Sequence, residues 1–156
     1  RALDTGRARA RLGTAADELR GRTGARRVGA LGFSMGGWLA LLEATTGKLD
    51  AVAAYYAALG ERERAPIRCP VLLQLAEVDE WDPPDTPERF VAELRAAGTV
   101  VESHTWAGTE HSFANLDVPF HAPAPAAEAW SVTVALACTS SMASSIRCLL
   151  ARTRTG

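Results

Sequence analysis

Apolar and polar positions along the chain predict short buried strands that alternate with helices. Apolar runs with the length and composition of buried strands occupy 28–33, 51–57 and 71–76, and a fourth strand is expected at 100–106. Apolar residues recur at helical spacing within 1–26, 35–46, 86–97 and 123–137. This alternation favours an α/β fold in which helices cover the faces of a parallel sheet.

Turn and cap residues define where the predicted helices begin and end. Gly24 ends the first helical pattern, Gly47 is a plausible C-cap for the second, and Gly98 ends the third. In Thr86-Pro87, threonine is expected to be the N-cap and proline the first helical residue. The helix at 35–46 is apolar on most sides, so we expect it to be buried.

The segment Gly32-Phe33-Ser34-Met35-Gly36 joins a predicted strand to a predicted helix. It matches the G-x-S-x-G nucleophile elbow, in which a tight turn lifts the serine hydroxyl above the sheet. We expect both glycines to be needed because strand and helix approach closely there. The Met35 amide, at the helix N-terminus, is then a candidate oxyanion donor. The alternative is an ordinary glycine-rich strand–helix junction.

Candidate partners for Ser34 follow two later strands. A serine nucleophile needs a histidine base, which is normally oriented by a carboxylate. His111 lies in a predicted loop at 107–112, directly after a strand, and is favoured as general base. His104, inside a strand, and His121, among prolines, are interpreted as bystanders. The order serine, acid, histidine agrees with the α/β-hydrolase order.

The acid has more than one candidate in the loop at 77–85, EVDEWDPPD. Asp79 follows the third strand by three residues, where the orienting acid normally lies, and is favoured. Asp82 is the second choice, and Glu77 and Glu80 are close by. The remaining acids are interpreted as a solvated loop surface.

Composition excludes several classes of protein. The chain has 156 residues, 47% of them apolar, and a net charge of −1, which argues against disorder and against an electrostatic nucleic-acid binder. Its three cysteines lack metal-binding spacing, so neither a metal nor another cofactor is expected. No secretory signal is recognisable, and the apolar stretch at 131–150 is interrupted by polar residues. We therefore expect a cytoplasmic protein without a membrane partner.

The two ends of the sequence differ from its centre. Composition changes after Cys138, so residues 1–137 are assigned to one domain, and 138–156 are interpreted as a poorly ordered tail or one foreign to the fold. The sequence begins with Arg1 and not with methionine, and we expect it to be incomplete there.

Four segments, VGALGFSMGGWLAL, AVAAYYA, CPVLLQLAEVDEWDPP and WAGTEHSFAN, resemble the dienelactone hydrolase family of α/β-hydrolases. They lie between Val28 and Asn115. The resemblance implies a metal-free Ser34–His111–Asp79 triad acting on a small ester or lactone. It also implies a substrate pocket bordered by Phe33, Phe113 and Asn115.

The sequence departs from this family in three ways. Serine replaces the founding cysteine nucleophile at Ser34, which favours esterase-type acyl transfer. Asn115 stands where an arginine would bind the substrate carboxylate, which argues against dienelactone itself. The strands and the loop that precede the elbow in the family, including the second oxyanion donor, have no counterpart. We therefore expect the C-terminal part of an α/β-hydrolase, which alone is weakly active, self-associated through the free edge of the elbow strand, or inactive.

Competing functions remain open at this point. The leading hypothesis is a serine hydrolase that forms an acyl-enzyme. The alternatives are a truncated or degenerate module without catalysis, and an acyltransferase or peptidase on the same scaffold. Nucleotide binding is disfavoured because GALGFSMGG lacks both G-x-G-x-x-G and the P-loop lysine.

Overall fold

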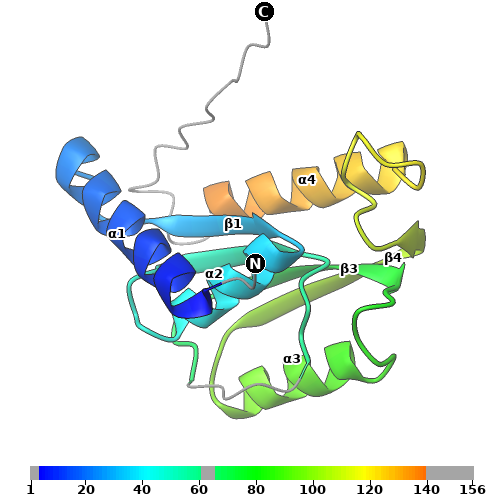
Figure 1. Cartoon of the computed structure of the whole chain (residues 1–156), viewed down its shortest axis with the longest axis horizontal. Helices are drawn as coiled ribbons and strands as arrows, with labels where there is room; N and C mark the ends of the chain where they lie inside the picture. The colour runs from blue at the N-terminus through cyan, green and yellow to red at the C-terminus, as the bar shows by residue number, and fades with distance from the viewer. Residues whose placement is uncertain (1–3, 61–65, 140–156) are drawn as a thin grey trace, which may run out of the picture.

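The computed structural model describes residues 4–60 and 66–139, which form a parallel sheet between two layers of helices (Figure 1). The sheet has the order β1-β2-β3-β4. Its strands are β1 (Gly29–Phe33), β2 (Ala51–Tyr55), β3 (Val71–Val78) and β4 (Val101–Glu110). The helices are α1 (Thr5–Thr23), α2 (Met35–Ala44), α3 (Thr86–Ala96) and α4 (Pro123–Thr139). The expected α/β fold with a parallel sheet is confirmed.

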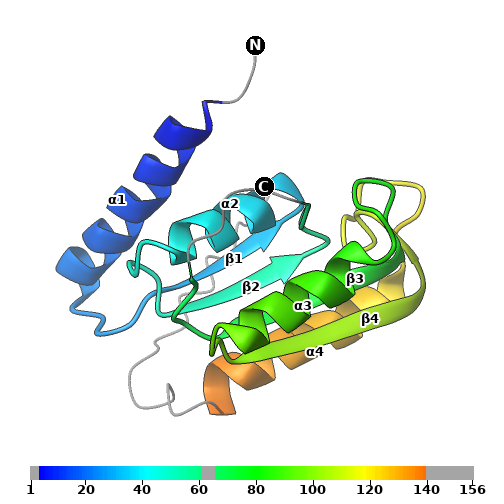
Figure 2. The same ribbon diagram turned by 90° about the horizontal axis from the view of Figure 1, so that it is seen from below.

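The helices divide between the two faces of the sheet. α2 and α3 cover one face and α4 covers the other, while α1 packs beside α2 (Figures 1 and 2). Every strand pair is parallel, from Gly29 opposite Ala51 to Val71 opposite Val101. The carboxyl ends of all the strands therefore meet at one edge of the sheet.

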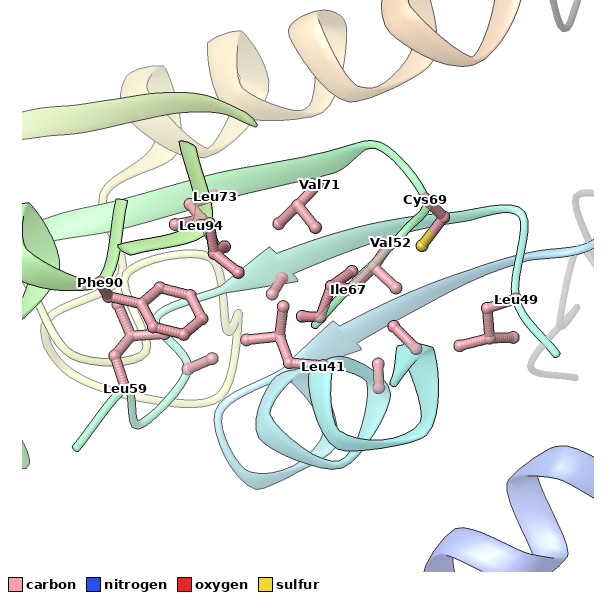
Figure 3. Close-up of a cluster of buried hydrophobic side chains, with 14 of the residues drawn as sticks. Leu41, Leu49, Val52, Leu59, Ile67, Cys69, Val71, Leu73, Phe90 and Leu94 are labelled. Carbon is pink, nitrogen blue, oxygen red and sulfur yellow. The ribbon is translucent and has the colours of Figure 1, made fainter. Parts of the chain in front are cut away.

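The main hydrophobic core lies between the sheet and the α2–α3 layer (Figure 3). Leu41 from α2 and Phe90 and Leu94 from α3 pack onto Val52 and Leu73 of the central strands. β3 is buried on both faces over its first six residues, because α4 lies on its other side. This explains why its first six residues, Gln74 excepted, are apolar instead of alternating.

A buried glutamine attaches α4 to the sheet. Gln74 of β3 is fully buried, and its amide donates to the Ala129 carbonyl oxygen at 3.0 Å. Its side-chain oxygen accepts from the Trp106 indole at 2.8 Å. Thr133 of α4 shares a hydrogen bond with the Tyr55 hydroxyl at 2.8 Å. Because buried polar groups are costly when unpaired, this network fixes α4 in one position.

Some predicted boundaries were wrong. Thr86 is the first residue of α3 and not its N-cap, which is Asp85. Its amide already donates to the Pro83 carbonyl in the preceding turn, so the helical geometry begins one residue early. β4 continues to Glu110, whereas a loop was expected from 107. α2 ends at Ala44 with Thr45 as C-cap, so Gly47, with a φ of 79°, follows the cap.

Two expectations concern the end of the chain and membranes. The predicted tail lies, from residue 140 onward, outside the described residues. Within 4–60 and 66–139, no helix is both long enough and apolar enough to cross a bilayer.

Candidate active site

Ser34 lies in a strained turn between β1 and α2. Its backbone has a φ of 50° and a ψ of −121°, a conformation that non-glycine residues seldom adopt. Two hydrogen bonds hold it there: the Ser34 amide donates to the Tyr55 carbonyl oxygen at 2.9 Å, and Trp38 N donates to Ser34 O at 3.1 Å. The turn therefore has the geometry that the elbow motif predicts.

The glycines of the elbow have unequal roles. A Cβ on Gly32 would overlap the backbone carbonyl of Gly36 and lie 2.5 Å from Gly37 N. A Cβ on Gly37 would lie 2.9 Å from the Ala57 Cβ. At Gly36 a Cβ would meet no atom within 4 Å, so the expectation that this glycine is needed for space was wrong. The tight contact is made by the Gly36 backbone against Gly32, and the Gly36 Cα faces outward.

Gly32→Ala is expected to destabilise the protein by about 1–3 kcal/mol, because its methyl group has only backbone to displace. Gly36→Ala is the matched control and should be neutral or stabilising by up to ~1 kcal/mol, since alanine favours the helix. Urea unfolding of both variants measures the difference. Equal midpoints for the two would contradict the role given to Gly32.

The ends of β3 and β4 are joined by hydrogen bonds across a bulge. The register of the two strands shifts between Ala76 and Val78. Here the Glu77 carboxylate accepts from Gly108 N at 2.7 Å, and the Thr109 hydroxyl accepts from Glu77 N at 3.2 Å. Figures 1 and 2 show both following loops at the edge where the strands end. A bulge re-aims the side chains that follow it, here Asp79 and His111.

Ser34, His111 and Asp79 form one hydrogen-bonded line. The Ser34 Oγ lies 2.9 Å from His111 Nε2. On the other side of the ring, His111 Nδ1 lies 3.0 and 2.9 Å from the two carboxylate oxygens of Asp79. The side chains of His111 and Asp79 are 15% and 17% exposed, so both are shielded but reachable. Such an arrangement can transfer a proton from the serine to the histidine.

Two aromatic rings, one buried and one exposed, lie close to His111. Tyr56 lies in the core with its ring centroid 5.2 Å from that of His111. Trp81 lies 6.0 Å from the same ring and is 66% exposed. Burial raises the pKa of Tyr56 to about 12, so its hydroxyl stays protonated at neutral pH. The strained backbone of Tyr56, with a φ of 36°, and of Ser112, with a φ of 68°, indicates that this region is held by its surroundings.

The second-choice acid, Asp82, makes a different contact. Its carboxylate accepts from Leu59 N at 2.6 Å, which ties the acidic loop to the segment after β2. The other predicted bystanders also lie elsewhere: His104 is paired with Glu102 on β4 at 2.7 Å, and the His121 amide donates to the Val118 carbonyl. Within the described residues, no group of three or more His, Cys, Asp or Glu is arranged to hold a metal ion.

The three residues expected to border the pocket have different environments. Phe33 is 43% exposed beside Ser34. Asn115 is exposed and its side chain accepts from Asp117 N at 3.0 Å, which shapes the histidine loop. Phe113 is fully buried and packs 5.4 Å from the Tyr56 ring, so it supports the site from beneath and does not line its surface.

Sequence reasoning missed Tyr56 and Trp81 as neighbours of His111. Trp81 left a signal, because a large aromatic residue is unusual in a loop of acids and prolines. No sequence feature marked Tyr56 as a neighbour of His111. Its apolar surroundings predicted only a buried strand, and its left-handed backbone cannot be recognised from sequence.

Comparison with protein families gives a match to the dienelactone hydrolase family over residues 4–139. The chain belongs to the dienelactone hydrolase family. No curated protein sequence matches the chain.

Solved structures agree with this assignment. A provisionally assigned dienelactone hydrolase from Klebsiella pneumoniae is 25% identical, with a TM-score of 0.78 over 87% of this chain and 62% of its own length. A dienelactone hydrolase-like promiscuous phosphotriesterase from metagenomic libraries is 24% identical, with a TM-score of 0.73 over 85% and 61%. A carboxylesterase from Lactobacillus plantarum is 15% identical, with a TM-score of 0.64 over 80% and 65%. The chain thus has the α/β-hydrolase fold and spans less than two thirds of each of these structures.

Proposed function

We propose that this dienelactone hydrolase family member is a serine hydrolase that cleaves a small carboxylic ester or lactone through an acyl-enzyme. The proposed domain covers residues 1–137. The nucleophile is Ser34, the general base is His111, and the orienting acid is Asp79. The observation that carries the proposal is the unbroken line of hydrogen bonds from Ser34 Oγ through the His111 ring to Asp79.

The chemistry follows from this geometry. His111 Nε2 accepts the hydroxyl proton while Ser34 Oγ attacks the carbonyl carbon of the ester. The same nitrogen then gives that proton to the leaving alcohol as the C–O bond breaks, which leaves an acyl group on Ser34. A water molecule, deprotonated by His111, hydrolyses the acyl-enzyme and restores the serine. Asp79 keeps the ring proton on Nδ1 throughout, so that Nε2 is free to accept.

Serine in place of cysteine makes the base indispensable, because a hydroxyl is hardly ionised at neutral pH. The developing oxyanion would be stabilised by the Met35 amide at the N-terminus of α2, where amides have no intrahelical partner. We assign only this one donor. Removal of a single donor typically lowers turnover about 10²–10³-fold, so the Met35 amide has a substantial share in the proposed catalysis.

A fluorophosphonate probe tests the proposal without knowledge of the substrate. The Ser34 oxygen is expected to displace fluoride from phosphorus, which adds one phosphonyl group to the protein. Intact-protein mass spectrometry should show stoichiometric labelling of the parent chain and none of Ser34→Ala. Circular dichroism of both proteins establishes that the variant is folded.

The alternative is a module that keeps the fold but does not catalyse. It predicts a folded parent chain that the probe leaves unlabelled, which would overturn the hydrolase proposal. Labelling that persists in Ser34→Ala would overturn the assignment of the nucleophile alone.

We further propose that the chain self-associates through β1. Within the described sheet, β1 is an end strand, and Leu31 on it is 43% exposed. An apolar strand edge of this kind is a template for pairing with a second copy. Size-exclusion chromatography with light scattering should give a dimer for the parent chain and a monomer for Leu31→Lys. Leu19→Lys, on the exposed side of α1, is the control and should remain dimeric. A monomeric parent chain at the same concentration would contradict the proposal.

A further inference from the structure

Exposed apolar side chains gather at the edge of the sheet that carries Ser34 and His111. Ten large apolar side chains of the described residues are exposed. Six of them lie at or just beyond the carboxyl ends of β1, β3 and β4: Phe33, Met35, Val78, Trp81, Leu116 and Phe120. Such a patch on a soluble domain marks a binding surface.

The Asp and Glu side chains in the segments around the same edge give it a negative charge. Residues 77–85 contain five aspartates and glutamates, and residues 107–122 contain two more. Neither segment contains a lysine or an arginine, and the elbow at 31–38 is uncharged. The first basic side chain beyond the acidic loop, Arg89, already lies 3.6 Å from the Asp85 carboxylate. A negatively charged ligand would therefore meet repulsion here and find no cation in these segments.

Trp81 connects the apolar surface to the reaction centre. Its amide donates to Asp79 Oδ1 at 3.1 Å, which fixes the residue in the loop that orients His111. Its ring centroid lies 6.0 Å from that of His111, with the two ring planes inclined at 55°, and the buried Tyr56 ring lies 5.2 Å from the same imidazole. An exposed indole in this place presents a flat apolar surface within reach of a group attached to Ser34.

We infer that the site selects esters without negative charge, and that Trp81 is the specificity-determining residue on which the apolar part of the substrate rests. This inference rests on the proposed function and names its substrate class. The reaction stays an ester hydrolysis: the acyl–oxygen bond breaks, the alcohol leaves with a proton, and water supplies the hydroxyl of the acid.

The first test compares two esters that differ only in charge. In p-nitrophenyl pentanoate the acyl chain ends in a methyl group, and in the mono-p-nitrophenyl ester of glutaric acid a carboxylate replaces it. The kcat/KM of the glutarate is expected to be about tenfold lower or more, and added salt should narrow the gap. Glu80→Lys should also reduce the difference in kcat/KM between the two esters. Glu18→Lys, which changes another exposed glutamate on α1, should leave that difference unchanged.

The second test isolates Trp81 by a ratio of substrates. The preference for p-nitrophenyl hexanoate over p-nitrophenyl acetate in kcat/KM is expected to fall about three- to tenfold in Trp81→Ala, mainly through KM. Trp81→Phe should retain most of the preference for the hexanoate because a phenyl ring keeps the flat apolar surface. Trp130→Ala, at an exposed indole of α4, should not change the ratio.

The outcomes of these tests distinguish failure of the specificity inference from failure of the serine hydrolase proposal. A chain that reacts with the fluorophosphonate but hydrolyses the neutral and the negatively charged ester equally fast overturns the inference and leaves the hydrolase proposal standing. An unchanged hexanoate-to-acetate ratio in Trp81→Ala overturns the role of Trp81. A folded chain that the probe does not label overturns both proposals.

Discussion

His111→Ala is expected to lower the kcat for p-nitrophenyl acetate hydrolysis by roughly 10⁴–10⁶-fold, an effect as large as that of removing the nucleophile in Ser34→Ala. His111 Nε2 lies 2.9 Å from Ser34 Oγ, and it is positioned to accept the proton of that hydroxyl. Without it the hydroxyl proton has no acceptor, so attack on the ester slows to the rate of an unassisted serine. Steady-state kinetics and the rate of fluorophosphonate labelling should both fall.

Two other histidines serve as matched controls for this prediction. His104 is paired with Glu102 on β4 and stacks 6.0 Å from Trp106, and His121 lies in the loop before α4. His104→Ala and His121→Ala should retain activity within about threefold, as surface changes usually do. If His111→Ala kept comparable activity, the role of general base would have to be abandoned.

The fold was predictable largely because its central strand β3 is buried on both faces over its first six residues. Continuous apolar runs such as Val71–Ala76 are distinctive of parallel strands, and the glycines between segments divided the chain correctly. Boundaries were less accurate where tertiary contacts extend an element. β4 continues to Glu110 because its end pairs with the bulged end of β3, and a bulge leaves no pattern in the sequence.

The three main residues of the candidate site could be predicted because each of them follows directly after a strand. The order of Ser34, Asp79 and His111 along the chain, each just after a strand, implied that they meet at one edge, and the structure brings them within hydrogen-bonding distance. The surroundings of His111 were not predictable in the same way. Tyr56 and Trp81 reach it from separate loops, and which loops converge depends on the strand order and on left-handed residues that the sequence does not reveal.

Asp79→Asn is expected to lower kcat about 10⁴-fold while leaving the fold intact. The carboxylate of Asp79 accepts from the Nδ1–H of His111, so the ring proton stays on that side. An asparagine can present its NH₂ group to Nδ1 instead, which shifts the ring proton to Nε2. The nitrogen that faces Ser34 would then be a donor and could no longer accept the hydroxyl proton.

Asp82→Asn is the matched comparison, because sequence alone left Asp82 as the second candidate for the orienting acid. Its carboxylate accepts from Leu59 N, and an asparagine oxygen can accept the same hydrogen bond. We therefore expect Asp82→Asn to lose less than about tenfold in kcat, with a small loss of stability near 1 kcal/mol at most. Parallel measurement of kcat and of the urea midpoint separates the two positions. A loss in Asp82→Asn as large as that in Asp79→Asn, at an unchanged midpoint, would show that the acidic loop acts through Asp82, and the tautomer argument for Asp79 would fail.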